Sequence, residues 1–170
     1  MKAKLYIILH FIIVCGLGIL SHFLYDWSGQ NVLVGFFTSI NESTWEHLKL
    51  LFFPMVFISI LETILFKKKL KDFIPARTYG ILTGMAFIII VFYTFWGISG
   101  KLIDFVNVTI YIMAVYFAFR TEKFLRDNKK LPDLCICIAI LISITLLFII
   151  FTLHSPEVGI FYDLSLHPKG

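Results

Sequence analysis

The sequence predicts an all-α integral membrane protein, a bundle of five transmembrane helices that forms a single membrane domain over residues 1–170. Apolar residues make up 59% of the chain and charged residues only 15%, which is far from the balance of a water-soluble protein. Five apolar runs also approach or exceed about 20 residues, the length at which a helix crosses the hydrocarbon layer of a bilayer.

Each apolar run is expected to be a helix, because the runs are continuous and show no alternation of apolar and polar residues. The runs cover residues 5–25, 43–66, 77–98, 102–119 and 134–153. Residues 28–41, between the first two runs, are apolar over too short a length to cross a membrane. This segment is expected to be either interfacial or re-entrant. Residues 154–170 form a tail after the last span.

The basic residues are distributed unevenly about these spans, and twelve of the 15 fall on one side of the predicted membrane. Those twelve are Lys2, Lys4, Lys67, Lys68, Lys69, Lys71, Arg77, Arg120, Lys123, Arg126, Lys129 and Lys130. Because Lys and Arg mark the cytoplasmic side, we expect a plasma-membrane protein with a cytoplasmic N-terminus and an extracytoplasmic C-terminus. Trp27, Trp45 and Trp96 fall at the predicted outer ends, where indole rings prefer the head-group level. The net charge of +4 is explained by this topology and by contact with the lipid bilayer, so no nucleic-acid partner is expected.

Polar and ionisable side chains gather at the predicted outer ends of the helices. Placing such groups in membrane segments costs free energy, so each one calls for a functional or a structural explanation. The six candidate catalytic residues are His22, Asp26, Glu42, Glu46, His47 and Lys49. Asp104 and Asn107, at the start of the fourth helix, and His154, at the end of the fifth, are secondary polar candidates. The tail adds Glu157, Asp163 and His167 on the same side.

Imidazole and carboxylate groups together suit zinc or another divalent metal, and His22, Glu46 and His47 are the candidate ligands. Without a metal, the same groups suit general acid and base catalysis, with Lys49 stabilising a developing anion.

A structural explanation competes for the acidic residues, because Ser43 and Glu46 have the spacing of a capping box. Glu42 and Asp104 likewise lie where a helix N-terminus favours negative charge. The spacings among the candidate metal ligands His22, Glu46 and His47 do not form a specific metal motif.

Two further features lie deeper in the predicted helices. His10 and Glu62 fall at similar depths in the first two antiparallel helices and are expected to form an intramembrane pair, which is explained most simply as a structural contact and more ambitiously as a proton relay. Gly80 and Gly84 form a G-x-x-x-G pattern, which indicates close helix packing either within the bundle or between copies.

Two motifs carry a resemblance to a known family. At HFLYDW (22–27) and NESTWEHLKLLFFP (41–54) the sequence resembles a family of small bacterial polytopic membrane proteins classed only as a domain of unknown function. The resemblance extends over nearly the whole chain in length and span order. It implies a multi-pass fold in a bacterial inner membrane and implies no mechanism.

Three functional hypotheses follow from the sequence. The first is a membrane-embedded, hydrolase-like enzyme that acts on a lipid-type substrate at the outer face. The second is a binding or transport component for an ion or small polar solute, gated by residues 28–41. The third is a membrane scaffold or partner subunit, for which the G-x-x-x-G surface would be the working part.

Overall fold

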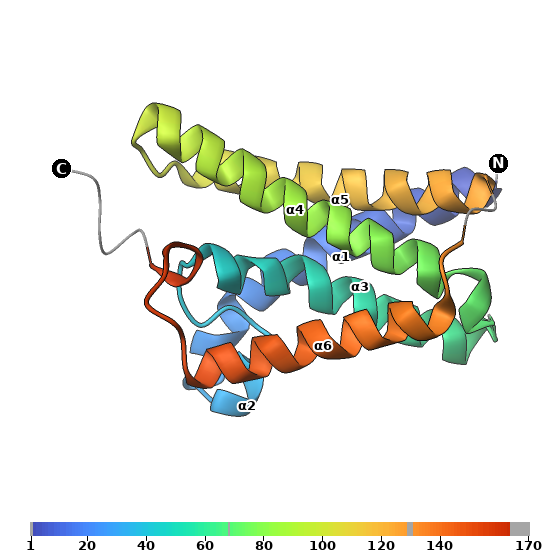
Figure 1. Ribbon diagram of the computed structural model, residues 1–170, viewed down its shortest axis with the longest axis horizontal. Helices are drawn as coiled ribbons and strands as arrows, with labels where there is room; N and C mark the ends of the chain where they lie inside the picture. Colours follow the sequence, from blue (N-terminus) through green and yellow to red (C-terminus); the bar gives the residue numbers. More distant parts are fainter. Residues whose placement is uncertain (1, 68, 129–130, 164–170) are drawn as a thin grey trace.

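The computed structural model describes residues 2–67, 69–128 and 131–163, and all regular structure within them is helical, which confirms the predicted all-α class. The long helices are α1 (Lys2–Trp27), α3 (Thr44–Phe66), α4 (Ile74–Ser99), α5 (Asp104–Asp127) and α6 (Leu134–Leu153). The short ones are α2 (Val32–Gly35) and the 3₁₀ turns η1 (Leu70–Asp72) and η2 (Gly159–Phe161). The long helices run roughly lengthwise through an elongated bundle (Figure 1).

Local sequence explains where several helices begin and end. The Ser43 hydroxyl accepts a hydrogen bond from the amide of Glu46 at the start of α3, and the Asp133 carboxylate accepts from two amides at the start of α6. Gly100 ends α4 with a left-handed φ of 64°, a conformation that glycine adopts without steric cost.

Four of the described helices, α1, α3, α4 and α6, are long and apolar enough to cross a membrane. Helix α5 has 24 residues but does not join them, because polar residues occupy both of its ends. Asp104 and Asn107 lie at one end, and the charged stretch from Arg120 to Asp127 lies at the other. The predicted count of five spans is therefore not confirmed, and it remains a prediction.

One end of the bundle brings together the C-terminal ends of α1, α4 and α6 and the N-terminal ends of α3 and α5 (Figure 1). Helix α2 lies at this same end, which we call the site end. Trp27 closes α1, Trp45 is the second residue of α3, and Trp96 lies in the last turn of α4. All three indoles therefore belong to helix ends at the site end.

Helix α3 provides much of the core, since Leu51, Phe52 and Met55 are fully buried. Helix α4 packs closely on α5 through Gly80 and Gly84. A Cβ atom at Gly80 would lie 2.6 Å from the carbonyl oxygen of Ala118, and one at Gly84 would lie 3.1 Å from that of Ala114. The G-x-x-x-G surface is thus used within the bundle.

At the end opposite the site end, α1, α3, α4 and α5 are joined by a buried ion network around Arg77, whose side chain is 1% exposed. The Arg77 guanidinium contacts Glu122 at 2.5 Å and Glu62 at 3.2 Å, and Nε2 of His10 lies 3.0 Å from Glu62. Arg126 adds a contact to Glu122 at 3.3 Å. His10 and Glu62 thus lie in contact within a larger network, which favours the structural explanation of their pairing.

Candidate functional site

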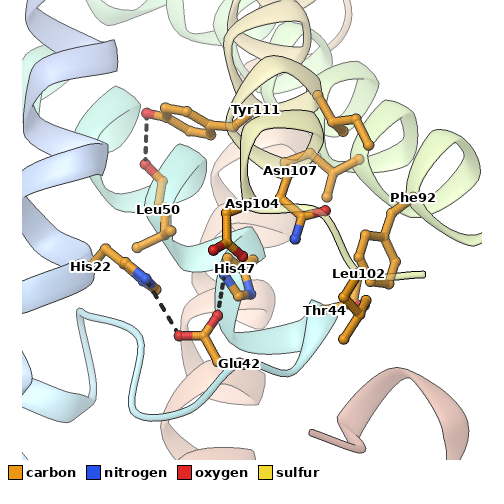
Figure 2. Close-up of a pocket in the computed structure, with 12 residues that line it drawn as sticks. His22, Glu42, Thr44, His47, Leu50, Phe92, Leu102, Asp104, Asn107 and Tyr111 are labelled. Carbon is orange, nitrogen blue, oxygen red and sulfur yellow. Dashed lines mark hydrogen bonds and ion pairs between the residues drawn. The ribbon is translucent and has the colours of Figure 1, made fainter. Parts of the chain in front are cut away.

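Two imidazoles and one carboxylate converge at the site end of the bundle. Nε2 of His22, near the end of α1, lies 3.4 Å from Oε1 of Glu42, and Nε2 of His47, in the first turn of α3, lies 3.3 Å from Oε2. One ligand atom from each of the three residues lies within 4.8 Å of the other two. Figure 2 shows the three side chains pointing toward one another, with Glu42 between the rings. We call this group the His–Glu–His cluster.

The hydrogen bond made by the other ring nitrogen of His47 determines what this residue presents to the cluster. Nδ1 lies 2.8 Å from the carbonyl oxygen of Ser43. A carbonyl oxygen can only accept a hydrogen bond, so the proton is on Nδ1. In the neutral ring, Nε2 then directs a lone pair at the Glu42 carboxylate, and a positive charge, from a proton or a metal ion, is needed between them. Backbone anchoring of the distal nitrogen is typical of histidines that bind metals.

The electrostatics at Glu42 follow from the same contacts. The hydrogen bond with His47 lowers the pKa of the Glu42 carboxyl below its ordinary value, opposed by partial burial and assisted by the charges of His47 and His22. The carboxylate is therefore ionised at neutral pH. The backbone amide of Glu42 donates to Oδ2 of Asp163, 3.2 Å away. This hydrogen bond ties the C-terminal tail to the residue that precedes the Ser43 cap.

A cavity of about 360 Å³ adjoins the cluster between α3, α4 and α5. Its polar wall contains the cluster with Asp104 and Asn107, which project from the first turn of α5 toward it (Figure 2). The rest of the wall is mainly apolar and consists of Leu50, Ile88, Phe92, Leu102, Ile110 and Tyr111, with Thr44 at the start of α3. The cavity can therefore hold a molecule that has both polar and apolar parts.

Two buried polar atoms on this wall have no hydrogen-bond partner among the described residues: Nδ1 of His22 and Oγ1 of Thr44. Thr44 is only 4% exposed, and it is the first residue of α3. A buried polar atom without a partner is costly, so both atoms are suited to binding a ligand in the cavity.

Glu46, predicted to be a metal ligand, faces away from the cluster. Its Oε2 accepts from the amide of Ile40 at 3.1 Å and from Nζ of Lys49 at 2.6 Å. It does not return to the amide of Ser43 as a capping box would require, because the side chain of Asn41 occupies that amide. The carboxylate in the cluster is Glu42, so the predicted ligand set is corrected at this position.

Lys49 is fully buried and stabilises the backbone of the segment between α1 and α3. Besides Glu46, its ammonium donates to the carbonyl oxygens of Gly35 and Thr38 and to the hydroxyl of Thr152 in α6. The segment around α2 is thus held against α3 and α6 by one cation. Lys49 does not line the cavity, which separates it from the catalytic role considered for it.

The other predicted residues are placed as follows. Asp26 and His154 are exposed, and neither lines the cavity, although both belong to the site end. Asp26 lies one turn beyond His22 on α1 but does not join the cluster. Glu157 is exposed in the tail, and His167 lies outside the described residues.

Sequence reasoning missed Thr44, Tyr111, and the Arg77 and Glu122 members of the network around the predicted His10–Glu62 pair. A hydroxyl in an N-terminal turn and a tyrosine in an apolar run are common, so neither gave a specific signal. Glu122 could have been found from its position one turn beyond Phe119, had the fourth helix been extended past the end of its apolar run.

Comparison with known families assigns the chain. The sequence matches the family described as "Family of unknown function (DUF6512)" over residues 1–167. No curated protein and no solved structure matches it. Because the match extends over almost the entire sequence, the chain belongs to the DUF6512 family.

Proposed function

We propose that this protein is a membrane-embedded, metal-dependent hydrolase that acts on a lipid-type substrate at the outer face of the membrane. The observation that carries the proposal is the His–Glu–His cluster beside a cavity that is mostly apolar. Two histidines and a glutamate form one of the ligand sets of catalytic zinc sites, which keep a fourth position open for water or substrate.

The distances within the cluster support this assignment. Ligand atoms about 2.1 Å from a tetrahedral zinc ion lie about 3.4 Å apart. Each imidazole nitrogen lies at about this distance from a different oxygen of Glu42, at 3.4 Å for His22 and 3.3 Å for His47. One ligand atom from each of the three residues lies within 4.8 Å of the other two, which is close enough for the side chains to share one ion. A zinc ion bound there would supply an activated water molecule and polarise a substrate oxygen.

The neighbouring residues of the chain suit the remaining roles. The carboxylate of Asp104 projects into the same cavity and can accept a proton from the attacking water. The amide of Asn107 and the hydroxyl of Thr44 can donate hydrogen bonds to substrate oxygens. The apolar wall excludes water and would pack against the hydrocarbon part of the substrate.

The proposal includes the topology. We take α5 as the fifth span, because it is 24 residues long and packs closely against α4 where Gly80 and Gly84 meet Ala118 and Ala114. With the basic residues at the opposite end, the N-terminus is cytoplasmic and the site end is extracytoplasmic.

An enzyme is favoured over a transport route or a scaffold. Between the site end and the opposite end lies a packed layer that includes the fully buried side chains of Val14, Leu51 and Met55. The buried Arg77 network lies beyond that layer. The G-x-x-x-G surface, the feature that motivated a scaffold, is covered by α5.

The test is the metal content of the purified full-length protein in detergent, measured by elemental analysis after exposure to zinc and removal of excess. Wild-type protein should hold one zinc ion per chain. Glu42→Gln and His47→Ala should each reduce zinc affinity by more than the about 10- to 100-fold that loss of a supporting residue costs.

Asp26→Asn and His154→Ala are matched controls, because both residues belong to the site end but lie outside the cavity. Both should retain full zinc content. Wild-type protein without stoichiometric metal, or a Glu42→Gln variant that binds zinc as well as Asp26→Asn does, would contradict the proposal. Zinc-loaded protein should also release product from a panel of phospholipid and isoprenyl phosphate esters, and the Glu42→Gln variant should not.

A further inference from the structure

The cavity beside the His–Glu–His cluster continues toward the lipid side of the bundle. A second cavity, of about 170 Å³, lies between α1 and α5 and shares seven lining residues with the first, including all three members of the cluster. The residues that it adds are Gly18, Ile19, Phe23 and Val108. The two cavities therefore meet at the cluster.

Gly18 is buried, and the other three added residues are apolar and exposed. Ile19, Phe23 and Val108 are 44%, 45% and 46% exposed, and the first two lie inside the span formed by α1. Exposed apolar side chains at this depth face lipid chains. Helices α1 and α5 also separate toward the site end (Figure 1), so this second cavity lies where the two helices part. We call the opening lined by these three side chains the α1–α5 portal.

The residues at the floor of the opening are fixed in place. The hydroxyl of Tyr111 donates to the carbonyl oxygens of Val14 and Leu50 at 2.9 and 3.3 Å, which ties α5 to α1 and α3. Gly18 makes this possible, because a Cβ atom there would lie 1.9 Å from that hydroxyl oxygen. Tyr111 thus marks the point where α5 contacts α1, and the second cavity lies between these two helices on the site-end side of it.

The polar part of the site is suited to an anionic, oxygen-rich head group. The N-terminus of α3, which carries a partial positive charge, begins at Thr44 on the cavity wall. The unpartnered hydroxyl of Thr44 and Nδ1 of His22 lie on the same wall. A bound divalent metal ion would add positive charge, which the Glu42 carboxylate offsets only in part. A phosphate ester has the charge and the acceptor oxygens to satisfy these groups.

We infer that the substrate is a membrane lipid with a phosphate-ester head group, which enters sideways from the outer leaflet through the α1–α5 portal. This inference rests on the proposed function and names its substrate class and route. The cavity of about 360 Å³ is at the small end for a ligand pocket, so it holds the head group and the start of a chain while the remaining chain stays in the bilayer.

The experiment uses the full-length protein in phosphatidylcholine vesicles that contain a small fraction of phosphatidic acid with a photoactivatable diazirine close to its head group. After illumination, mass spectrometry locates the labelled residues. Leu50 and Ile110 line the cavity and are each 6% exposed, so lipid in the bulk bilayer does not reach them. Labelling of these two residues therefore reports lipid that has entered.

The matched pair of variants is Ile19→Trp and Leu20→Trp. The two side chains are adjacent on α1 and equally exposed, at 44% and 43%, but only Ile19 lines the portal. Ile19→Trp should reduce labelling of Leu50 and Ile110 by about tenfold, because an indole overfills the opening. Leu20→Trp should label as wild type does, and both variants should retain the wild-type zinc content.

Three results would overturn the inference: no labelling of Leu50 and Ile110 in wild-type protein, equal labelling in Ile19→Trp, or equal losses in the two variants. Soluble glycerol 3-phosphate provides the other arm. If it binds wild type and Ile19→Trp equally while the lipid leaves Leu50 unlabelled, the site takes its phosphate from water. Zinc binding without lipid labelling would contradict lipid entry through the α1–α5 portal but not the proposed metal site. Lipid labelling that depends on Ile19, in protein that binds no metal, would contradict the metal-dependent hydrolase but not the portal.

Discussion

Replacing Lys49 by methionine should destabilise the protein strongly. The Lys49 ammonium is fully buried and has four oxygens within hydrogen-bond distance of its three N–H groups, those of Glu46 and Thr152 at 2.6 Å, Gly35 at 2.9 Å and Thr38 at 3.4 Å. Methionine fills most of the same volume but supplies no donor. Among the residues that the structure describes, the Glu46 carboxylate, 2% exposed, would retain one hydrogen-bond donor, the amide of Ile40.

The expected loss follows from the charge that remains. Breaking a buried ion pair by removing one partner costs about 3–5 kcal/mol, because the other charge is left uncompensated. Removing both charges avoids this cost, so the double variant Glu46→Gln/Lys49→Met should be more stable than Lys49→Met alone by about 2 kcal/mol or more. The single-site control is Lys101→Met, since Lys101 is exposed and its loss should change stability by less than about 0.5 kcal/mol.

The measurement is the free energy of unfolding of the purified protein in mixed micelles, titrated with a denaturing detergent and followed by Trp fluorescence. A loss below about 1 kcal/mol for Lys49→Met, or a double variant no more stable than the single one, would refute the reasoning. Because Lys49 holds the backbone that leads to Glu42, the single variant should also bind zinc about tenfold more weakly.

Three other predictions concern separate parts of the molecule. The lowered pKa of Glu42 stabilises the fold above the ordinary value of 4.5, and this contribution is lost as the pH falls from about 4.5 through the folded-state pKa; acid titrations of unfolding should show it in wild type and lack it in Glu42→Gln. Gly80→Ala should cost about 1–3 kcal/mol in detergent unfolding, because its Cβ would meet the carbonyl of Ala118 at 2.6 Å, whereas Gly97→Ala meets nothing within 4 Å and should be neutral or stabilising. Glu62→Gln should lower stability by about 3 kcal/mol while zinc content per folded chain stays at the wild-type value; a loss of zinc would instead link the two ends of the bundle.

The helical fold was predictable because bilayer thickness imposes a length that apolar runs reveal directly. The fourth run was the least predictable element. Its apolar part ends at Phe119, yet α5 continues to Asp127, since Glu122 in the extra turns meets Arg77 across the bundle. The charged stretch after Phe119 is typical of a loop, and the sequence alone does not show that Glu122 pairs with Arg77 on another helix. By length and apolar composition, four of the described helices can span a membrane, and the assignment of α5 as a fifth span remains a prediction.

The candidate site was predictable only in part. Depth placed His22 and His47 at the same helix ends, but depth does not say which of two nearby carboxylates joins them. Glu46 has Lys49 one turn along the same helix face, so the buried lysine takes that carboxylate and leaves Glu42 to the imidazoles. The contact of Asp163 with the amide of Glu42 joins residues 121 positions apart, and no local pattern could indicate it.

The Arg77 network has a consequence for how the chain is made. Helices α1, α3, α4 and α5 each contribute at least one member, so no single one of them carries a neutral, satisfied set of side chains into the membrane by itself. When α4 is made, Glu62 of the preceding α3 is already present, but Arg77 lacks its second carboxylate, Glu122, until α5 leaves the ribosome. Charged groups that face lipid are expensive. Biogenesis should therefore delay release of the early helices into lipid until α5 has arrived. A chain truncated before Glu122 should be retained by the insertion machinery or degraded.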